Sequence, residues 1–382
     1  MRLVLNATYN TSVRDGIAHF IRRIAPPLSR LCELTVLTSD PDSYGSFCET
    51  RRIPKWANSG SGRLAWTMAL RREHLLGECE CLICPTPVAA PGLGVPILTV
   101  VHDLTPLVVR RSLPARTKFM FWTLMQSVRW ADGIVVDSEH TRQDLIRLKL
   151  VREHCISVVP AGPGVEPSGL GGEGGLDLRP YVLYVGGHAV HKNLTRLITA
   201  FARVLRGSRL RLVLVGWREP ALLARTEAAI RRNGVERQVV VLPGGLSDAQ
   251  VSDLYRNCSL FIYPSLYEGF GLPVLEAMAH GVPVACSRSS SLPEVGGDAV
   301  LYFDPLSVDD IAAKMKRILD DARLESELRL RGHERARCFS WQRTAQGICD
   351  ASLAAASSSC ARRSRRTHSH PRHGTVAASH EV

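Results

Sequence analysis

The sequence predicts two α/β domains, each built on a doubly wound, mainly parallel β-sheet. Short apolar runs alternate with helical segments along most of the chain, which is typical of parallel sheets covered by helices. This alternation stops once, in a Gly- and Pro-rich stretch at 161–180, and then restarts. The chain has 382 residues, more than one hydrophobic core usually supports. We therefore expect domains at 1–160 and 181–340, joined by a linker at 161–180.

The first half alternates apolar strands with amphipathic helices. The predicted strands are 2–8, 34–37, 81–84, 97–101, 134–136 and 156–159. The predicted helices are 17–31, 64–76, 116–130 and 139–148. Asp15-Gly16 closes the loop before the first helix, where glycine lets a ligand approach the backbone closely.

The second half repeats the pattern at a similar size. Its predicted strands are 181–185, 210–215, 239–242, 260–263 and 282–285. Its predicted helices are 193–205, 220–233, 248–257 and 273–280. Ligands of such sheets bind beyond the carboxyl ends of the strands. Two such edges facing each other across a cleft would accommodate two substrates.

The end of the chain is predicted to be helical and then disordered. Helices are expected at 309–321 and 324–338, and a last helix at 341–356 with Ser340 as its N-cap. The tail at 357–382 is rich in Ser, Ala, Arg and His and has too few apolar residues to order itself. A solvated tail is the simpler interpretation, and contact between its arginines and an anionic membrane is the alternative.

The composition indicates a globular, basic chain. Hydrophobic residues make up 45% and charged residues 22%, and the formal net charge is +12. This excess favours anionic partners, which include nucleotides, phospholipid surfaces and nucleic acid. The eleven cysteines are scattered through apolar runs, so we expect a reducing, cytoplasmic location. Cys79, Cys81 and Cys84 fit a buried strand better than a zinc site, and no apolar run is long enough to span a membrane.

One string, PSLYEGFGLPVLEAMAHGVPV at 264–284, joins a buried strand, a glycine-containing turn and a helix. Gly269 and Gly271 let the backbone turn sharply and approach a ligand. Pro273 suits the first position of a helix. The amides of Val274 and Leu275 would then be unpaired at the positive end of the helix dipole. The string therefore predicts a diphosphate site.

Two carboxylates flank this turn. Glu268 precedes the glycines, and Glu276 lies in the first turns of the helix. A carboxylate repels phosphate, so both residues fit better as acceptors for neutral sugar hydroxyls. The alternative is that Glu268 is a turn residue and that Glu276 only favours the helix start. Each glutamate alone leaves both interpretations open.

Weaker signals come from Gly187, Lys192 and His102. Gly187 ends a Gly-Gly turn after strand 181–185, and Lys192 lies at the next helix start, so the pair fits either a phosphate site or an ordinary surface. His102 follows strand 97–101, where it is either a donor to substrate or a partly buried structural histidine. The chain has no GxSxG or HExxH motif and no acidic cluster spaced for a metal. This fits a group transfer in which the donor carries its own leaving group.

The chain resembles retaining glycosyltransferase family 4, whose members use nucleotide sugars and have two facing Rossmann-like domains, the GT-B fold. The resemblance is closest over 242–305, which contains the string above and SLPEVGGDAVLYFDP. It is looser over 181–205 and over 100–141, where VVHDLTP and VVDSEHT resemble first-domain signatures. It therefore implies a GT-B fold and transfer of a hexose with retention of configuration.

The resemblance also implies roles for the candidate residues. Glu276 would hold the ribose of the nucleotide, Glu268 the donor sugar, and Lys192 the phosphate. His102 would lie near the transferred sugar, and Gly16 would belong to an acceptor or phosphate loop. The implied catalytic residues are His102, Lys192 and Glu268. The implied donor-binding residues are Gly16, Gly187, Lys192, Glu268, Gly269, Phe270, Gly271, Val274, Leu275 and Glu276. The resemblance implies no cofactor and no metal.

The chain departs from the family pattern near the second glycine turn. Gly187 replaces a common arginine, and Lys192-Asn193 resembles the pair of a mannosyltransferase-like subset, which favours GDP-mannose as the donor. His191 stands where that subset often has arginine, so phosphate neutralisation would depend more on Lys192.

The expected partners are a nucleotide-sugar donor and a glycan or lipid-linked acceptor bound to the first domain. The segment 110–130 fits a core-packed helix with a basic outer face, and contact with the inner face of the cytoplasmic membrane is the alternative. A catalytically degenerate sugar-nucleotide-binding protein stays open as a second function. A nucleic-acid-binding protein is a weaker alternative, because the arginines are dispersed rather than patterned. We therefore expect no nucleic-acid partner.

Overall fold

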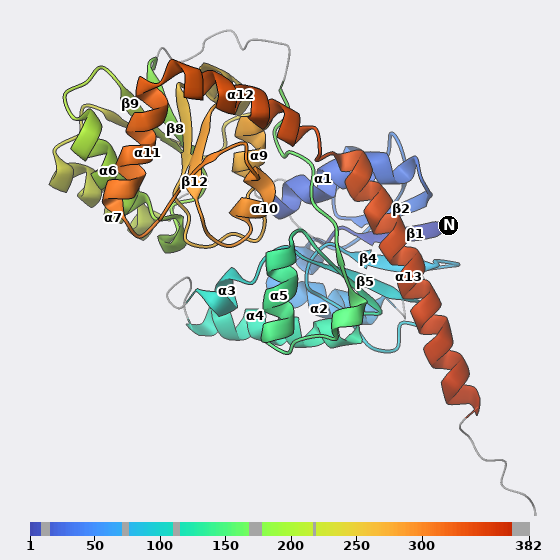
Figure 1. The fold of residues 1–382 in the computed structure, drawn as a ribbon. Coiled ribbons are helices and arrows are strands. Elements are labelled where there is room, and N and C mark those ends of the chain that lie inside the picture. The colour runs from blue at the N-terminus through green and yellow to red at the C-terminus, as the bar shows by residue number, and fades with distance from the viewer. Residues whose placement is uncertain (9–15, 71–75, 110–114, 168–177, 217–218, 369–382) are drawn as a thin grey trace, which may run out of the picture.

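The computed structural model contains two parallel β-sheets, one in each half of the chain (Figure 1). The structure describes residues 1–8, 16–70, 76–109, 115–167, 178–216 and 219–368. The first sheet has the strand order β3-β2-β1-β4-β5-β6-β7 and the second has the order β10-β9-β8-β11-β12-β13. Both orders reverse direction once, between β1 and β4 and between β8 and β11. The doubly wound prediction is therefore confirmed, and ligands of such sheets bind at these reversal points.

The first domain follows the predicted alternation closely. Its strands are β1 (Arg2–Asn6), β2 (Glu33–Thr38), β3 (Glu49–Arg52), β4 (Cys81–Cys84), β5 (Ile97–Val101), β6 (Gly133–Val136) and β7 (Ile156–Val158). Its helices are α1 (Gly16–Ser29), α2 (Gly60–Ala69), α3 (Thr105–Val108), α4 (Ala115–Ser127) and α5 (Glu139–Arg147). The predicted loop residue Asp15 lies outside the described residues.

The second domain shows the same agreement. Its strands are β8 (Tyr181–Val185), β9 (Arg211–Val215), β10 (Val239–Leu242), β11 (Leu260–Tyr263), β12 (Val284–Ser287) and β13 (Leu301–Phe303). Its helices are α6 (Leu194–Leu205), α7 (Pro220–Asn233), α8 (Asp248–Asn257), α9 (Leu272–Ala279), α10 (Leu292–Gly296), α11 (Val308–Asp320) and α12 (Ala322–Ala336). Two strands were not predicted, β3 and β13. Both lie at a sheet edge, where a strand needs neither length nor a continuous apolar run.

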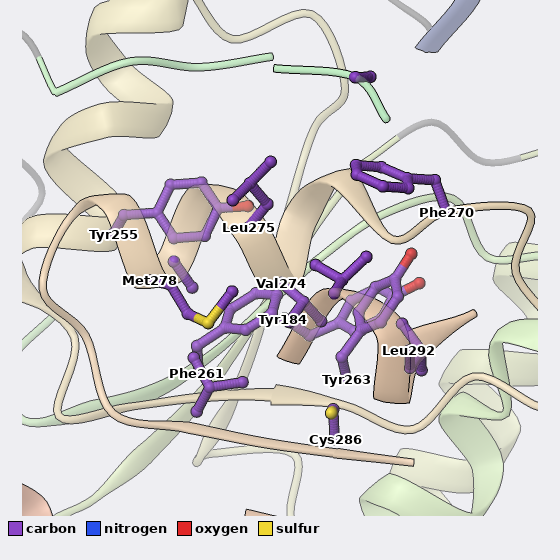
Figure 2. Packing of buried hydrophobic residues seen from close by; sticks show 14 of the residues in the cluster. Tyr184, Tyr255, Phe261, Tyr263, Phe270, Val274, Leu275, Met278, Cys286 and Leu292 are labelled. Atoms are coloured by element: carbon purple, nitrogen blue, oxygen red, sulfur yellow. The ribbon is translucent and has the colours of Figure 1, made fainter. Parts of the chain in front are cut away.

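The hydrophobic core of the second domain fixes the position of α9. Figure 2 shows Val274, Leu275 and Met278 of α9 lying over Tyr184, Phe261 and Tyr263 of the sheet. The rings of Tyr184 and Tyr263 stack with centroids 5.8 Å apart. All of these side chains are buried. The start of α9, with its glycine turn, is therefore held on a rigid base.

The last helix, α13 (Trp341–His368), returns to the first domain. Figure 1 shows it leaving the second domain and running beside the first sheet, and it contacts α1 and strands β4 to β6. Gly133 of β6 and Gly347 of α13 allow this approach, since a Cβ on either would crowd the facing element. The helix was expected to end near Ala356 and to be followed by disorder, but it continues to His368. The rest of the predicted tail lies outside the described residues.

The described start of the linker packs against the rest of the chain. Ala161 and Val165 are buried. Trp341 Nε1 donates to the carbonyl of Pro163 at 2.8 Å, and Thr344 Oγ1 donates to that of Pro160 at 2.8 Å. The start of α13 thus holds the crossing between the domains in place.

Candidate functional site

The candidate residues of the second domain gather at the carboxyl ends of β8 and β11. Lys192 ends a short 3₁₀ turn at Val190–Lys192, and its Nζ lies 2.7 Å and 3.0 Å from the two carboxylate oxygens of Glu268. Tyr263 Oη also accepts from Lys192 Nζ at 3.1 Å. The sequence had named both charged residues separately. The structure joins them into one ion pair.

This pair is mostly buried, and each partner keeps the other charged. Burial by itself disfavours both charges, but Lys192 lowers the pKa of Glu268 and Glu268 raises the pKa of Lys192. The carboxylate still has lone pairs for a sugar hydroxyl, because the lysine uses only part of its acceptor capacity. Glu268 is therefore an ionised acceptor at neutral pH and not a proton donor.

Asn193 explains why a Lys-Asn pair stands at this turn. Its backbone is in the left-handed region, with φ of 62°, which asparagine tolerates better than most residues. Its side-chain amide donates to the carbonyl oxygens of Pro264 at 3.0 Å and Pro305 at 2.7 Å. Asn193 thus ties the loops after β11 and β13 to the turn that presents Lys192.

His191, which replaces an arginine of the family subset, does not supply positive charge. Burial, reinforced by the neighbouring Lys192, lowers the pKa of His191 to about 4. The imidazole is therefore neutral at physiological pH. Within the described residues Lys192 is the cation next to Glu268 on this turn. The expectation that Lys192 neutralises a bound phosphate stays a prediction.

Serine side chains hold the loop that carries Glu268. Ser290 Oγ accepts from the Glu268 amide at 2.8 Å. Ser291 Oγ lies within hydrogen-bond distance of the carbonyls of Glu268 and Phe270, at 3.0 Å and 2.8 Å. Neither serine was among the predicted site residues. Their role is to fix the backbone on both sides of the Glu268 carboxylate.

The start of α9 differs in one respect from the prediction. The helix begins at Leu272, and the amides of Val274 and Leu275 both donate to the Gly271 carbonyl, at 3.0 Å and 3.3 Å. The prediction that these two amides are unpaired is therefore wrong. The helix starts one residue earlier than Pro273 because Gly271, with φ of 114°, reverses the chain just before it. The free end of the helix dipole lies at Gly271 and Leu272.

Phe270 and Gly187, two other predicted donor-binding residues, are placed by packing. The Phe270 ring is buried and meets Phe339 edge to face, with centroids 5.9 Å apart. The Gly187 carbonyl accepts from Tyr184 Oη at 2.7 Å. The Phe270 ring is therefore used in packing and not available to a ligand.

Gly16 lies close to the start of α9, although it belongs to the first domain. It is the first residue of α1, and a Cβ built on it would be 3.9 Å from Leu272 Cδ1. The positive ends of α1 and α9 therefore meet across the domain boundary. The start of a helix favours an anion, so a phosphate near these two residues would be stabilised.

Glu276 is buried and its carboxylate has only neutral partners. Tyr255 Oη donates to Oε2 at 2.8 Å, and the Val165 amide donates to Oε1 at 3.1 Å. A Cβ on Gly164 would lie 2.5 Å from Oε1, so the linker approaches the carboxylate as closely as glycine allows. Burial raises the pKa of Glu276 to about 7, because these hydrogen bonds offset only part of the cost of removing the charge from water.

His102 lies on the first domain between an aromatic ring and a carboxylate. Its Nδ1 is 2.6 Å from Asp137 Oδ2, and its Nε2 is 3.2 Å from the Pro85 carbonyl. Phe20 meets the imidazole edge to face at 4.7 Å. Both ring nitrogens thus face acceptors, which is the arrangement for a protonated imidazolium. Burial opposes the charge, but Asp137 outweighs it and the pKa of His102 is raised.

Sequence reasoning missed Asp137 and Tyr255. Asp137 lies in the VVDSEHT string at the end of β6, next to β5 in the sheet, so strand adjacency could have paired it with His102. Tyr255 lies on α8, and no local pattern marked it. Its contact with Glu276 depends on how α8 and α9 pack.

The domains touch at the site itself. Gly269 lies against the backbone of His102, and a Cβ there would overlap the His102 carbonyl. The structure therefore brings the first-domain histidine together with the glycine turn of the second domain. Among the described residues no group of three or more His, Cys, Asp or Glu side chains could hold a metal ion. None of the described helices is long and apolar enough to cross a membrane.

Comparison with known proteins identifies the family of both halves. Residues 14–165 match the family described as Glycosyltransferase Family 4, and residues 175–337 match Glycosyl transferases group 1. The O-antigen chain mannosyltransferase B of Escherichia coli is 33% identical over 321 residues, which cover 74% of this chain and 81% of that protein.

Solved structures agree on the fold. Sucrose-phosphate synthase from Thermosynechococcus elongatus superposes with a TM-score of 0.72 at 19% identity, covering 97% of this chain and 100% of that one. Anabaena Alr3699/HepE in complex with UDP and glucose gives a TM-score of 0.72 at 17% identity, covering 92% of this chain and 98% of that one. The two doubly wound domains meet at the glycine cradle, which we define as residues 268–276. With these matches, the chain belongs to glycosyltransferase family 4.

Proposed function

We propose that the protein is a retaining mannosyltransferase that moves mannose from a nucleotide diphosphate sugar, with GDP-mannose as the favoured donor, to a glycan or lipid-linked acceptor. The observation that carries this proposal is the ion pair between Lys192 and Glu268, which directly precedes the turn into α9, together with the buried Glu276 on α9 itself. The mannosyltransferase relative supports the choice of sugar. The donor is a substrate, and the proposal requires neither a cofactor nor a metal.

In this proposal the donor lies across the cradle with its diphosphate between the starts of α1 and α9. Gly16 and Gly271 let the phosphate oxygens approach the backbone, and the helix dipoles favour their charge. Glu276 accepts from the ribose hydroxyls and Glu268 accepts from hydroxyls of the sugar. Lys192, already held by Glu268, lies where it can stabilise the charge that develops on the departing phosphate.

The proposed transfer needs no protein nucleophile. The bond between the sugar C1 and the phosphate oxygen breaks, and the acceptor oxygen forms a new bond to C1 on the same face. The acceptor hydroxyl gives its proton to the departing phosphate oxygen, so the products are the glycoside and the nucleoside diphosphate. His102 donates a hydrogen bond to the sugar after its Nε2 leaves the Pro85 carbonyl. The contact of Gly269 with His102 keeps water from C1.

Donor binding and transfer test the proposal separately. We expect the melting temperature of the protein to rise with GDP-mannose more than with UDP- or dTDP-sugars. NMR of the product should show the anomeric configuration of the donor. Binding without transfer to any acceptor would favour a degenerate sugar-nucleotide-binding protein. No response to any nucleotide sugar would contradict the proposal.

Helix α4 carries the features that support a membrane contact. The sequence favoured a core-packed helix with a basic outer face, but only Leu124, Met125 and Ser127 of α4 are buried. Phe119 is 68% exposed, and Met120 and Trp122 are exposed as well. The rings of Phe119 and Trp122 stack with centroids 6.1 Å apart. No Asp or Glu occurs from 104 to 131, a stretch that contains several Arg and Lys residues. Exposed aromatic side chains with basic neighbours fit the surface of an anionic bilayer.

We therefore propose that the protein contacts the inner face of the cytoplasmic membrane through α4. Phe119→Ser/Trp122→Ser should lose binding to phosphatidylglycerol vesicles in a sedimentation assay while donor affinity stays unchanged. Trp56→Ser is the matched control, because Trp56 is similarly exposed elsewhere in the first domain. Equal vesicle binding by both variants and the wild type would exclude α4 as the contact.

A further inference from the structure

A carboxylate of the second domain caps a helix of the first. Glu294 of α10 accepts hydrogen bonds from the amides of Glu139 at 2.7 Å and His140 at 2.8 Å. These amides belong to the first two residues of α5, where helix amides lack partners within the helix and the dipole favours a negative charge. Glu294 is therefore an N-terminal cap supplied across the domain boundary. Its bonds exist only while the domains are together.

Helix α5 and its N-cap also bind the cradle loop, residues 267–269. Ser138 Oγ and Thr141 Oγ1 both lie within hydrogen-bond distance of the Gly269 carbonyl, at 2.6 Å and 3.2 Å. Tyr267 Oη donates to Asp144 Oδ2 at 2.7 Å. Ser138, Thr141, Asp144, Tyr267 and Gly269 are buried, so separation of the domains would expose them to water. The bonds that Glu294 accepts lie at the exposed edge of this contact. The start of α5, with Asp144 one turn further along the helix, thus contacts the cradle loop on both sides of one residue.

That residue is Glu268. Its neighbours Tyr267 and Gly269 are bound to the first domain, while its own amide is bound to Ser290 of the second domain. The loop is therefore suspended between the two domains at the carboxylate that faces Lys192. Gly269 also lies against the His102 backbone. The position of the Glu268 carboxylate consequently depends on domain closure, and the position of Glu276 does not depend on these bonds.

We infer that Glu294, Ser138 and Thr141 form a closure latch, and that Glu294 is a positioning residue that acts through Glu268. This inference rests on the proposed function, in which Glu268 holds the transferred sugar. With the latch formed, the cradle loop is fixed for transfer. With the latch broken, the nucleotide still binds through Glu276 and α9, but the sugar is held less well. The latch therefore affects turnover more than nucleotide affinity.

The variant Glu294→Gln tests the latch. It keeps the size of the side chain but removes the charge and turns one acceptor into a donor that faces a backbone amide. We expect turnover with saturating GDP-mannose to fall about fivefold. Loss of a helix cap shifts the equilibrium between closed and open domains by about this factor, and only the closed form transfers the sugar. The dissociation constant for GDP, measured by calorimetry, should stay within about twofold of the wild type, because the Glu294 carboxylate binds α5 and not Glu276 or its partners. The radius of gyration from small-angle X-ray scattering should increase in the ligand-free protein.

A matched control and a second variant complete the test. Glu334→Gln removes an exposed glutamate of α12 in the same domain and should leave turnover and the radius of gyration unchanged. Ser138→Ala/Thr141→Val should reproduce the loss of turnover but with a lower melting temperature, because Ser138 is also the N-cap of α5. Glu294→Gln should stay within about 4 °C of the wild-type melting temperature, since Ser138 still caps the helix, and Glu334→Gln should not change it. Unchanged turnover and scattering in Glu294→Gln would overturn the latch. So would a loss of turnover accompanied by a lower melting temperature and weaker GDP binding.

The scattering measurement separates this inference from the proposed function. If the wild type binds no nucleotide sugar, the proposed function fails, and the ligand-free scattering curves still report whether Glu294 holds the domains together. If the wild type transfers mannose and the variant does not differ from it, the latch alone fails.

Discussion

Glu268 and Glu276 belong to one turn-and-helix motif, yet the fold gives them opposite electrostatic environments. Glu268 faces a lysine, and its pKa is lowered despite burial. Glu276 faces a tyrosine hydroxyl and a backbone amide, and its pKa is raised to about 7. The difference shows that burial alone does not set the charge of a carboxylate. A cationic partner outweighs the loss of hydration, whereas two neutral hydrogen bonds do not.

Removing Lys192 should abolish the difference between the two carboxylates, and it should have the largest effect on stability and turnover of the variants proposed here. Lys192→Ala leaves the Glu268 carboxylate buried without its partner, so the free energy of unfolding should fall by about 3 kcal/mol. Turnover should fall by about 100-fold or more, because a group that stabilises departing phosphate charge is lost. Chemical denaturation and steady-state kinetics measure the two effects.

Lys192→Met/Glu268→Gln is the matched control for that variant. It removes both charges, so stability should recover toward the wild type while activity stays low. A double variant as unstable as Lys192→Ala would mean that lysine packing, and not the ion pair, supports the turn.

Glu276 predicts a pH dependence that Glu268 does not share. If ribose hydroxyls donate to the ionised carboxylate, affinity for GDP-mannose should decrease as the pH falls through about 7. Glu276→Gln should weaken donor binding by about 2–3 kcal/mol at pH 8 and remove this pH dependence. Calorimetry between about pH 6 and 8, roughly one unit on each side of the midpoint, measures both effects. An unchanged affinity would exclude the ribose assignment.

The same carboxyl affects stability with the opposite sign. Its folded pKa lies above the unfolded value, so its stabilising contribution is complete below about pH 4 and is lost as the pH rises through about 7. The free energy of unfolding of the wild type should therefore fall relative to that of Glu276→Gln over this range. Parallel stability curves for the two proteins would show that the carboxyl is not perturbed.

The close approach of the linker to Glu276 can be tested by adding one methyl group. Gly164→Ala would place a Cβ 2.5 Å from Oε1 and push the Val165 amide away. We expect a loss of stability of about 1–3 kcal/mol and a further increase in the pKa of Glu276, seen as a shift of the donor-binding pH profile to higher pH. Gly45→Ala is the matched control, because a Cβ there would make only an ordinary contact of 3.5 Å with the Pro41 carbonyl.

The smallest expected effect concerns the tyrosine hydroxyl. Tyr255→Phe removes one neutral hydrogen bond to Glu276 and should lower the free energy of unfolding by about 1 kcal/mol. The pH midpoint of donor binding should rise, because the ionised carboxylate loses a donor. A lower midpoint would mean that Tyr255 stabilises the protonated form, and the contrast with Glu268 would then be weaker.

Much of the fold could be predicted because the signals are local. The strands Cys81–Cys84, Ile97–Val101, Tyr181–Val185 and Leu260–Tyr263 are continuous apolar runs, as strands buried on both faces must be. The prediction failed for elements that are not continuous apolar runs. β3 is the polar sequence ETRR at a sheet edge, and α13 extends past the point where its apolar pattern ends.

The candidate site was predictable as a set of residues but not as a set of contacts. The string at 264–284 named Glu268, Glu276 and the glycines, while Lys192 and His102 were found at the ends of neighbouring strands. The error at Val274 and Leu275 came from the helix boundary, which Gly271 moves by one residue. Assignment of donor roles to these residues stays a prediction that the variants above test.

The sequence by itself determined the two α/β domains, the glycine turn and the presence of two glutamates, because periodicity and backbone freedom act between residues close in the chain. Only the tertiary structure decided that Glu268 meets Lys192 while Glu276 meets Tyr255 and Val165. It also decided that Glu294 reaches α5 of the other domain. The charge of a buried carboxyl depends on groups within a few ångströms in space, and those groups come from distant parts of the chain.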